Sequence, residues 1–140
     1  MKDWVTIPTL FADEMTIDYT SVLGGEAQTL KGDARMEFWG VFGQKLDKFH
    51  HAISTITIDL PQPAEGTSQP TEVAARFNSN VTYVQESAKN GSVMNAGGRY
   101  EYRLKYAPDA PGNPWKLSYL KADPVWFTGN AALLMDPENA

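Results

Sequence analysis

The chain has 140 residues, a length typical of one domain that buries a core of its own. Apolar residues make up 42% and charged residues 21% of it, and the net charge of −5 argues against a general nucleic-acid binder, which needs a basic face. The absence of cysteine excludes disulfides, thiolate nucleophiles and zinc–thiolate sites.

The N-terminal part of the chain is predicted to hold a short helix and then a strand. Asp3 suits the N-cap of a helix with apolar residues at helical spacing. Pro8 places the start of that helix nearer Thr6, because proline is tolerated in the first turn. Residues 15–22 are rich in β-branched and aromatic side chains and predict a strand, and residues 23–32 predict a loop.

The rest of the chain predicts one helix and a run of long strands. Asp33 suits the N-cap of a helix over residues 34–48, with Trp39 and Leu46 along one face. The strands that follow are predicted over residues 50–60, 72–87, 94–107 and 115–127. Turns rich in proline and glycine divide them, and the segment 61–71 is expected to be an exposed hairpin connection.

This order of elements indicates the fold class. Consecutive long strands joined by turns imply an antiparallel or mixed, strongly curved sheet, with the N-terminal helices over its concave face. We therefore expect residues 1–140 to form a single α+β domain. The hollow between the sheet and the helices is the expected ligand site.

The two histidines are adjacent, and strand alternation separates them. His51, Ile53, Thr55 and Thr57 are expected to share one face of their strand, whereas His50 lies on the other. The His51 face is the more polar and suits a ligand cavity, while the His50 face suits packing. Adjacent histidines on opposite faces cannot chelate one ion together, so we expect no metal site.

The same alternation assigns faces to the tyrosines. Tyr19 lies on the face opposite Asp18, which we expect to cap a loop or to pair with a cation. Tyr83 and Tyr100 lie on the faces of their strands that carry the other rings. The expected walls of the pocket are Trp39, Phe42, Thr55, Phe77, Tyr83, Tyr100 and Trp126.

Several short motifs carry a resemblance to a known family. The order of elements, with LFADEMTIDYTSVLGGE, FHHAIS and PWKLSYLKADPVWFTGN, resembles the SnoaL-like branch of the nuclear-transport-factor-like cone fold. The enzymes to which the chain is most similar are the scytalone dehydratases, through KDW at 2–4, IDY at 17–19, His51 and WKLSYLK at 115–121. The resemblance runs from residue 2 to about 130, and it implies a sheet shaped as a cone around a pocket.

The resemblance also implies roles for particular residues. In scytalone dehydratase-like enzymes, the tyrosine of the IDY motif holds a water that polarises the substrate carbonyl, and a strand histidine is the general acid/base that removes water. These roles fall on Tyr19 and His51, while Tyr83 lies on or near the position of a second catalytic histidine. The chemistry is reasonable, because imidazole titrates near neutrality and a phenol stabilises an enolate oxygen.

The family's first helix, with a further tyrosine and an aspartate, has no counterpart in a sequence that begins at Met1. We expect either a protein that lacks one wall of the cone or a truncated product. The apolar surface left exposed is expected to drive assembly into a homo-oligomer, a dimer or trimer.

Two functions remain open at this point. The first is a cofactor-independent lyase/dehydratase or isomerase/cyclase acting on a small apolar oxygenated metabolite, such as a polyketide, terpenoid or steroid-like compound. His51 would be its acid/base, Tyr19 would polarise a carbonyl, and Tyr83 and Tyr100 would orient the substrate. The alternative is a non-catalytic small-molecule-binding or oligomerisation module. We expect no nucleic-acid or membrane partner and a cytoplasmic location, since no apolar stretch approaches the roughly 20 residues of a membrane span.

Overall fold

The structure, a computed structural model, describes residues 3, 5–60 and 68–135, without the side chains of Val41 and Phe42. The described elements in chain order are a 3₁₀ helix η1 (Ile7–Leu10), β1 (Phe11–Asp18), α1 (Thr20–Leu23), β2 (Gln28–Lys31), α2 (Ala34–Lys45), β3 (Lys48–Asp59), β4 (Glu72–Val84), β5 (Val93–Tyr106), β6 (Trp115–Gly129) and α3 (Ala132–Met135). Part of the predicted connection after β3, residues 61–67, lies outside the described residues.

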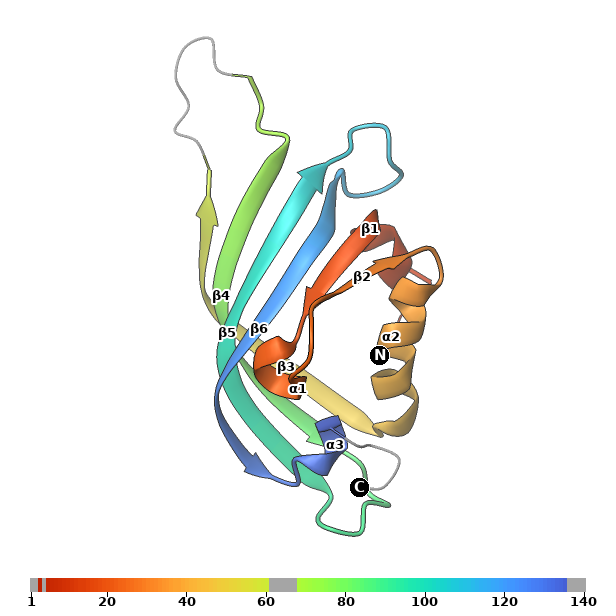
Figure 1. Ribbon diagram of the computed structural model, residues 1–140, viewed down its shortest axis with the longest axis vertical. Coiled ribbons are helices and arrows are strands. Elements are labelled where there is room, and N and C mark those ends of the chain that lie inside the picture. The colour runs from red at the N-terminus through yellow and green to blue at the C-terminus, as the bar shows by residue number, and fades with distance from the viewer. Residues whose placement is uncertain (1–2, 4, 61–67, 136–140) are drawn as a thin grey trace.

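The strands form one sheet in the order β2-β1-β6-β5-β4-β3. Neighbouring strands are antiparallel, except that β1 runs parallel to β6. The long strands curve, and α2 stands opposite the concave face of the sheet (Figure 1). The predicted α+β architecture, with a curved mixed sheet covered by a helix, is confirmed. The sheet is not closed, because β2 and β3 are its edges.

The N-terminal elements differ from the predicted ones. The expected helix near Thr6 is only the short η1, and Asp3 Oδ1 accepts hydrogen bonds from the amides of Val5 and Thr6, at 3.2 and 2.9 Å. The strand predicted over 15–22 begins at Phe11 and ends at Asp18. The predicted loop over 23–32 contains β2, which is a strand because it pairs with the open edge of β1.

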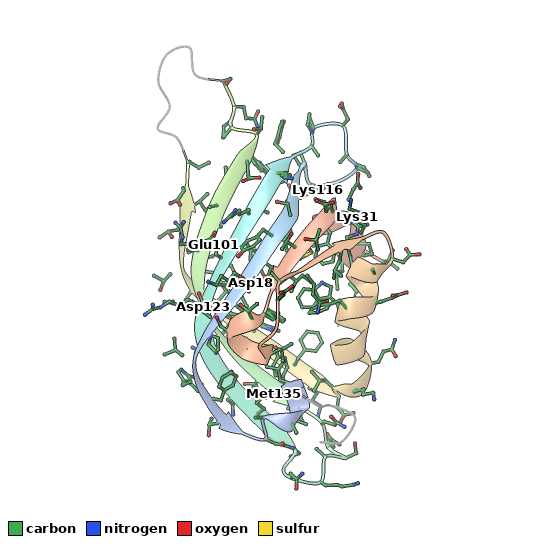
Figure 2. All side chains as sticks on the ribbon, in the orientation of Figure 1. Asp18, Lys31, Glu101, Lys116, Asp123 and Met135 are labelled. Carbon is green, nitrogen blue, oxygen red and sulfur yellow. The ribbon has the colours of Figure 1, made fainter. Side chains whose placement is uncertain are left out.

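The end of β1 has a local cause. Asp18 Oδ1 accepts hydrogen bonds from the amide and the hydroxyl of Thr20, at 3.1 and 2.6 Å, and its Oδ2 accepts one from the Tyr119 hydroxyl at 3.1 Å (Figure 2). These bonds compete with continued strand pairing and turn the chain into α1. The prediction that Asp18 caps a loop is therefore confirmed, and the turn leaves Tyr19 on the inner side of the sheet.

The interior packs as two clusters. The first consists of Leu46, Val81, Met94, Ala96 and Leu133, with Tyr83 and Leu134 packed against it. The second consists of Met15, Ile17, Leu117 and Leu120, with Tyr19, Phe38 and Trp39 packed against it. Burial of each large apolar side chain contributes about 1.5–3 kcal/mol to folding. Because the clusters do not merge, the space between Tyr19 and Tyr83 is left as a cavity.

A bulge in β3 changes which side chains face the hollow. The register against β4 shifts between Ser54 and Thr57, so that β3 holds one extra residue there, and Thr55 has a φ of 54°. Thr57 consequently pairs with Arg76, whose side chain is on the outer face. The prediction that His51, Thr55 and Thr57 share one face is wrong beyond Ser54.

Candidate active site

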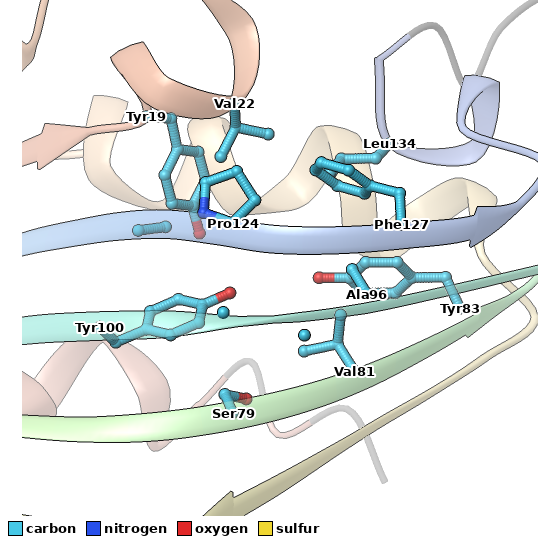
Figure 3. Close-up of a pocket in the computed structure, with 13 residues that line it drawn as sticks. Tyr19, Val22, Ser79, Val81, Tyr83, Ala96, Tyr100, Pro124, Phe127 and Leu134 are labelled. Atoms are coloured by element: carbon cyan, nitrogen blue, oxygen red, sulfur yellow. The ribbon is translucent and has the colours of Figure 1, made fainter.

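A hollow lies between the concave face of the sheet and α2, and it has two neighbouring parts. The outer chamber has a volume of about 190 Å³ and is lined by Ile7, Phe11, Tyr19, Trp39, Gly43, Leu46, Phe49, His51, Tyr83 and Leu134. The inner recess has a volume of about 30 Å³ and lies against β4, β5 and β6 (Figure 3). Tyr19, Tyr83 and Leu134 line both parts, so the outer chamber and the inner recess lie next to each other.

His51 reaches the outer chamber from the edge strand. It pairs with Val81 of β4, whereas His50 pairs with Thr82, so the two histidines lie on opposite faces as predicted. The imidazole makes edge-to-face contacts with the rings of Phe49 and Tyr83, with centroids 6.0 and 5.8 Å apart. Its Nε2 lies 3.4 Å from the Tyr83 hydroxyl, a long and therefore weak hydrogen bond.

The surroundings of His51 favour the neutral imidazole. Desolvation lowers its pKa below the usual 6.5, and the nearby His50 lowers the pKa further. The residue keeps an exposed edge to solvent, but the Phe49 and Tyr83 rings crowd the imidazole itself. A neutral imidazole at neutral pH can take up a proton, which is what a general base must do.

Three tyrosine hydroxyls are turned toward the middle of the cavity, those of Tyr19, Tyr83 and Tyr100 (Figure 3). Burial raises the pKa of Tyr19 well above its usual range, and the neighbouring Tyr100 and Tyr83 raise it further. Burial also raises the pKa of Tyr83 and of Tyr100. These phenols therefore stay protonated at any ordinary pH and remain hydrogen-bond donors.

Tyr19 is held in place by rings of α2. Its ring lies 5.9 Å from that of Phe38 and 6.2 Å from that of Trp39, between centroids. Trp39 lines the outer chamber beside it, and the buried Trp39 Nε1 has no hydrogen-bond partner among the described residues. The indole N–H is a donor only, so it can serve a carbonyl oxygen that enters the chamber.

Apart from these side chains and Ser79, the described lining of the cavity is apolar. The described residues that line it include no aspartate, glutamate, lysine or arginine, so His51 is its one group that changes charge near neutral pH. In such surroundings a hydrogen bond to a developing negative charge is worth more than it is in water. The arrangement can therefore remove a proton and stabilise the charge that forms.

The structure brings only some of the predicted pocket residues together. His51, Tyr19, Tyr83, Tyr100 and Trp39 line the cavity. The side chain of Phe42, in α2, lies outside the described part of the structure.

Three residues predicted to line the pocket, Thr55, Phe77 and Trp126, are not brought to it. Thr55 lies in the β3 bulge. Phe77 is buried behind Tyr100, with parallel rings 5.4 Å apart. Trp126 lies over Gly97, because a register shift between Gly97 and Gly98 changes the alternation of β6.

Sequence reasoning missed other lining residues, notably Ser79, Phe127 and Leu134. The register shift that turns Trp126 away places Phe127 in the inner recess. Leu134 comes from the short α3, and the apolar run that forms this helix was read only as part of a terminal segment. Ser79 could have been identified from the sequence as a lining residue, because it is a small polar residue on the same strand face as Val81 and Tyr83.

Within the described residues, no helix is long and apolar enough to cross a membrane. In the same part of the chain, no three histidine, aspartate or glutamate side chains gather as they do around a metal ion.

Comparisons with known proteins agree with the fold. The Kfla4162 protein from Kribbella flavida is 18% identical and covers 94% of this chain and 82% of its own, with a TM-score of 0.77. A candidate scytalone dehydratase from Novosphingobium aromaticivorans is 18% identical over 86% of this chain and 70% of its own, with a TM-score of 0.65. A type 3 hexachlorocyclohexane dehydrochlorinase from Novosphingobium barchaimii is 16% identical over 87% of this chain and 73% of its own, with a TM-score of 0.59.

At such identities the solved structures support the fold alone, and no curated protein sequence matches the chain. The sequence itself is matched by the family model of the SnoaL-like domain over residues 1–121. The match covers most of the chain and agrees with the curved sheet, the covering helix and the cavity between them. The chain belongs to the SnoaL-like domain family.

Proposed function

We propose that the protein is a cofactor-independent lyase that removes water from a small cyclic ketone bearing a hydroxyl group two carbons from the carbonyl. The observation that carries this proposal is the meeting of a neutral imidazole, His51, with protonated phenols in an apolar cavity. The same set of groups suits an isomerase or cyclase that begins with the same proton abstraction. Elimination of water is the simplest reaction that uses all of them.

His51 is the acid/base in this reaction. Its neutral imidazole takes the proton from the carbon next to the carbonyl, and the electrons of that C–H bond move toward the carbonyl oxygen. The imidazolium then gives the proton to the hydroxyl on the neighbouring carbon. The C–O bond breaks, a C=C bond forms and water leaves. Protons and charge balance within the site, so the reaction needs no further reactant.

Tyr19 stabilises the oxygen on which charge develops. Its raised pKa keeps the hydroxyl protonated, so the phenol donates to the carbonyl oxygen rather than competing with His51 for a proton. Trp39 lines the same chamber, and its buried Nε1 has no hydrogen-bond partner among the described residues. Tyr83, 3.4 Å from His51 Nε2, orients the imidazole and the leaving hydroxyl.

The cavity volume limits the substrate. A cavity of about 150 Å³ takes up benzene, and the outer chamber has about 190 Å³. The outer chamber therefore suits one six-membered ring with small substituents. A single-ring polyketide or terpenoid fits inside, whereas the four rings of a steroid exceed this volume.

The names of two proteins of similar structure refer to elimination reactions, which supports the proposal. One is a candidate scytalone dehydratase and another is a hexachlorocyclohexane dehydrochlorinase. A dehydratase and a dehydrochlorinase both form a double bond by loss of a small molecule. Both names are consistent with a base inside the cone. We choose water as the leaving group here because His51 can return its proton to a departing hydroxyl.

We also propose that the protein forms a homo-oligomer. Several apolar side chains are exposed on the edge strand β3 and on β6, namely Ile53, Ile56, Ile58, Val125 and Trp126. Apolar residues gathered on a surface mark sites of association. Sedimentation of the purified protein at micromolar concentration is expected to show a dimer or trimer, and a single monomeric species contradicts this proposal.

The catalytic proposal is tested with a panel of single-ring β-hydroxy ketones. Conversion to the conjugated enone is followed by its ultraviolet absorbance for the wild type, His51→Gln, Tyr19→Phe and the matched control His50→Gln. We expect conversion by the wild type and His50→Gln, a loss of roughly 10²–10⁴-fold in His51→Gln, and a smaller loss in Tyr19→Phe. A protein that binds these ketones and leaves them unchanged is a binding module instead.

A further inference from the structure

Ser79, in the middle of β4, is a buried polar residue without a partner. Its exposed fraction is 3%, and its hydroxyl makes no hydrogen bond with the described residues. The other buried polar residues in the described part of the chain behave differently. The Lys116 amine donates to the Thr9 and Pro111 carbonyls, at 2.6 and 2.9 Å (Figure 2).

Ser118 and Asn130 complete the contrast. The Ser118 hydroxyl donates to the Arg103 carbonyl at 3.1 Å. The Asn130 amide donates to the Gly91 carbonyl at 2.9 Å and accepts a hydrogen bond from the Ala132 amide at 3.1 Å. A buried hydroxyl without a partner costs free energy, and in a folded protein it calls for an explanation.

The neighbours of Ser79 explain why few side chains cover it on the sheet. Ser79 pairs with Gly98 of β5, which has no side chain to cover it, and with Ile53 of β3, which is half exposed. Ser79 lines the inner recess, together with Tyr100 (Figure 3). Ser79 is therefore a buried polar residue at the wall of the recess whose hydroxyl has no partner among the described residues.

Tyr100 is a further polar residue of the inner recess, which Tyr19 and Tyr83 line as well. Its ring lies parallel to that of Phe77, 5.4 Å away, and this contact fixes the direction of its hydroxyl. The recess has a volume of about 30 Å³, which is room for a single substituent and not for a ring. Ser79 and Tyr100 thus offer hydrogen bonds to one small oxygen group.

Strand pairing gives the offset, along the strand direction, between Ser79 and His51. His51 pairs with Val81, two residues along β4 from Ser79. Two residues of a β-strand span roughly 7 Å. That span is close to the length of one six-membered ring with a substituent at each end, so a ring held in the outer chamber can extend an oxygen into the inner recess.

We propose that Ser79 and Tyr100 form a second binding position, for an oxygen substituent on the side of the substrate ring opposite the reacting carbons. The inference rests on the proposed function, which places those carbons beside His51 and Tyr19. It narrows the substrate to a six-membered ring with two oxygen functions at opposite ends, one a carbonyl in the outer chamber and the other a hydroxyl or carbonyl in the inner recess.

The test compares two probes that differ in one hydroxyl, 4-hydroxyacetophenone and acetophenone. Their dissociation constants are measured by calorimetry or ligand-observed NMR for the wild type, Ser79→Ala and Ser118→Ala. The wild type is expected to bind the hydroxylated probe more tightly by roughly 2- to 10-fold, the effect of one hydrogen bond. This preference is expected to disappear in Ser79→Ala and to persist in Ser118→Ala.

Thermal melting gives a second readout that does not depend on the probes. Ser79→Ala is expected to melt at the same or a higher temperature, because the hydroxyl it removes has no partner among the residues that the structure describes. The matched control Ser118→Ala loses a hydrogen bond and is expected to melt at a lower temperature. A fall in the melting temperature of Ser79→Ala contradicts the inference.

The outcomes separate this inference from the catalytic proposal. Equal affinity of the wild type for both probes, no binding of either, or a preference that survives in Ser79→Ala contradicts the second binding position. A preference that depends on Ser79, in a protein that converts no hydroxy ketone, supports the binding position and contradicts the catalytic proposal alone. Turnover that depends on His51, in a wild type that binds both probes equally well, supports the catalytic proposal and contradicts the second binding position.

Discussion

His51 and Tyr83 meet across the pairing of β3 with β4, with Nε2 3.4 Å from the phenol oxygen and the ring centroids 5.8 Å apart. The contact crowds the imidazole, and the resulting desolvation keeps His51 neutral near pH 7. Tyr83 stays protonated, because burial raises its pKa. The pair therefore combines a proton acceptor with a hydrogen-bond donor that stays protonated.

The pH dependence of turnover is expected to report on His51. Desolvation and the nearby His50 lower the pKa of His51 below 6.5, so the neutral base survives to a lower pH than an ordinary histidine allows. We expect kcat/KM for a hydroxy ketone to be flat above pH 7 and to fall on the acid side at a pKa below 6.5. An acid limb centred above 6.5 contradicts the desolvated imidazole.

His50→Gln is expected to move that acid limb in a known direction. His50 is exposed and lies on the outer face, but its charge disfavours protonation of His51. Its removal is therefore expected to raise the pKa of His51 and to shift the acid limb to higher pH, with the plateau rate unchanged. The pH profile of the variant beside that of the wild type measures the shift. A pH profile of His50→Gln that is displaced to lower pH contradicts this effect of His50 on the pKa of His51.

Acid stability should depend on the same residue. Because the pKa of His51 is lower in the folded protein than in the unfolded chain, the unfolded chain binds more protons between the two pKa values. The contribution of His51 to stability is thus fully present above pH 6.5 and is lost as the pH falls through its folded pKa. Urea denaturation at a series of pH values is expected to show a smaller loss on acidification for His51→Gln than for the wild type.

Two glycine-to-alanine variants separate a crowded site from an open one. A Cβ at Gly98 meets the Asp123 carbonyl oxygen at 2.7 Å, and this neighbour is backbone that cannot turn away. Gly98→Ala is expected to destabilise the fold by roughly 1–3 kcal/mol. Gly40, inside α2, has its nearest neighbour at 3.7 Å, so Gly40→Ala should stabilise the fold by roughly 0.5–1 kcal/mol. Chemical denaturation of both variants checks the opposite signs.

Strand alternation was enough to predict the faces of several site residues. It separated His51 from His50 and placed Tyr83 and Tyr100 on inner faces, because period-two geometry holds wherever the pairing is regular. Alternation gave the wrong face for Thr55, because a bulge adds one residue to β3 there. The sequence at this bulge is an ordinary run of β-branched residues and contains no glycine or proline that would indicate it. The second bulge had a marker in Gly97-Gly98, since glycine within a strand often accompanies a bulge.

Other parts of the site needed the tertiary structure. Gln28–Lys31 is a strand only because the edge of β1 is available to pair with it. Ser79 becomes a candidate binding residue only once its neighbour is known to be Gly98, and the sequence does not reveal that register. The cytoplasmic location stays a prediction of the sequence.

The central claim is that His51 acts as a base toward a ketone held in the cavity. Its most direct measurement is the exchange of the methyl protons of 4-hydroxyacetophenone with D₂O at neutral pD, followed by NMR with catalytic amounts of protein. We predict clear acceleration by the wild type and His50→Gln, reduced acceleration by Tyr19→Phe, and exchange at the buffer rate with His51→Gln. Exchange that is equally fast with the wild type and His51→Gln contradicts the claim.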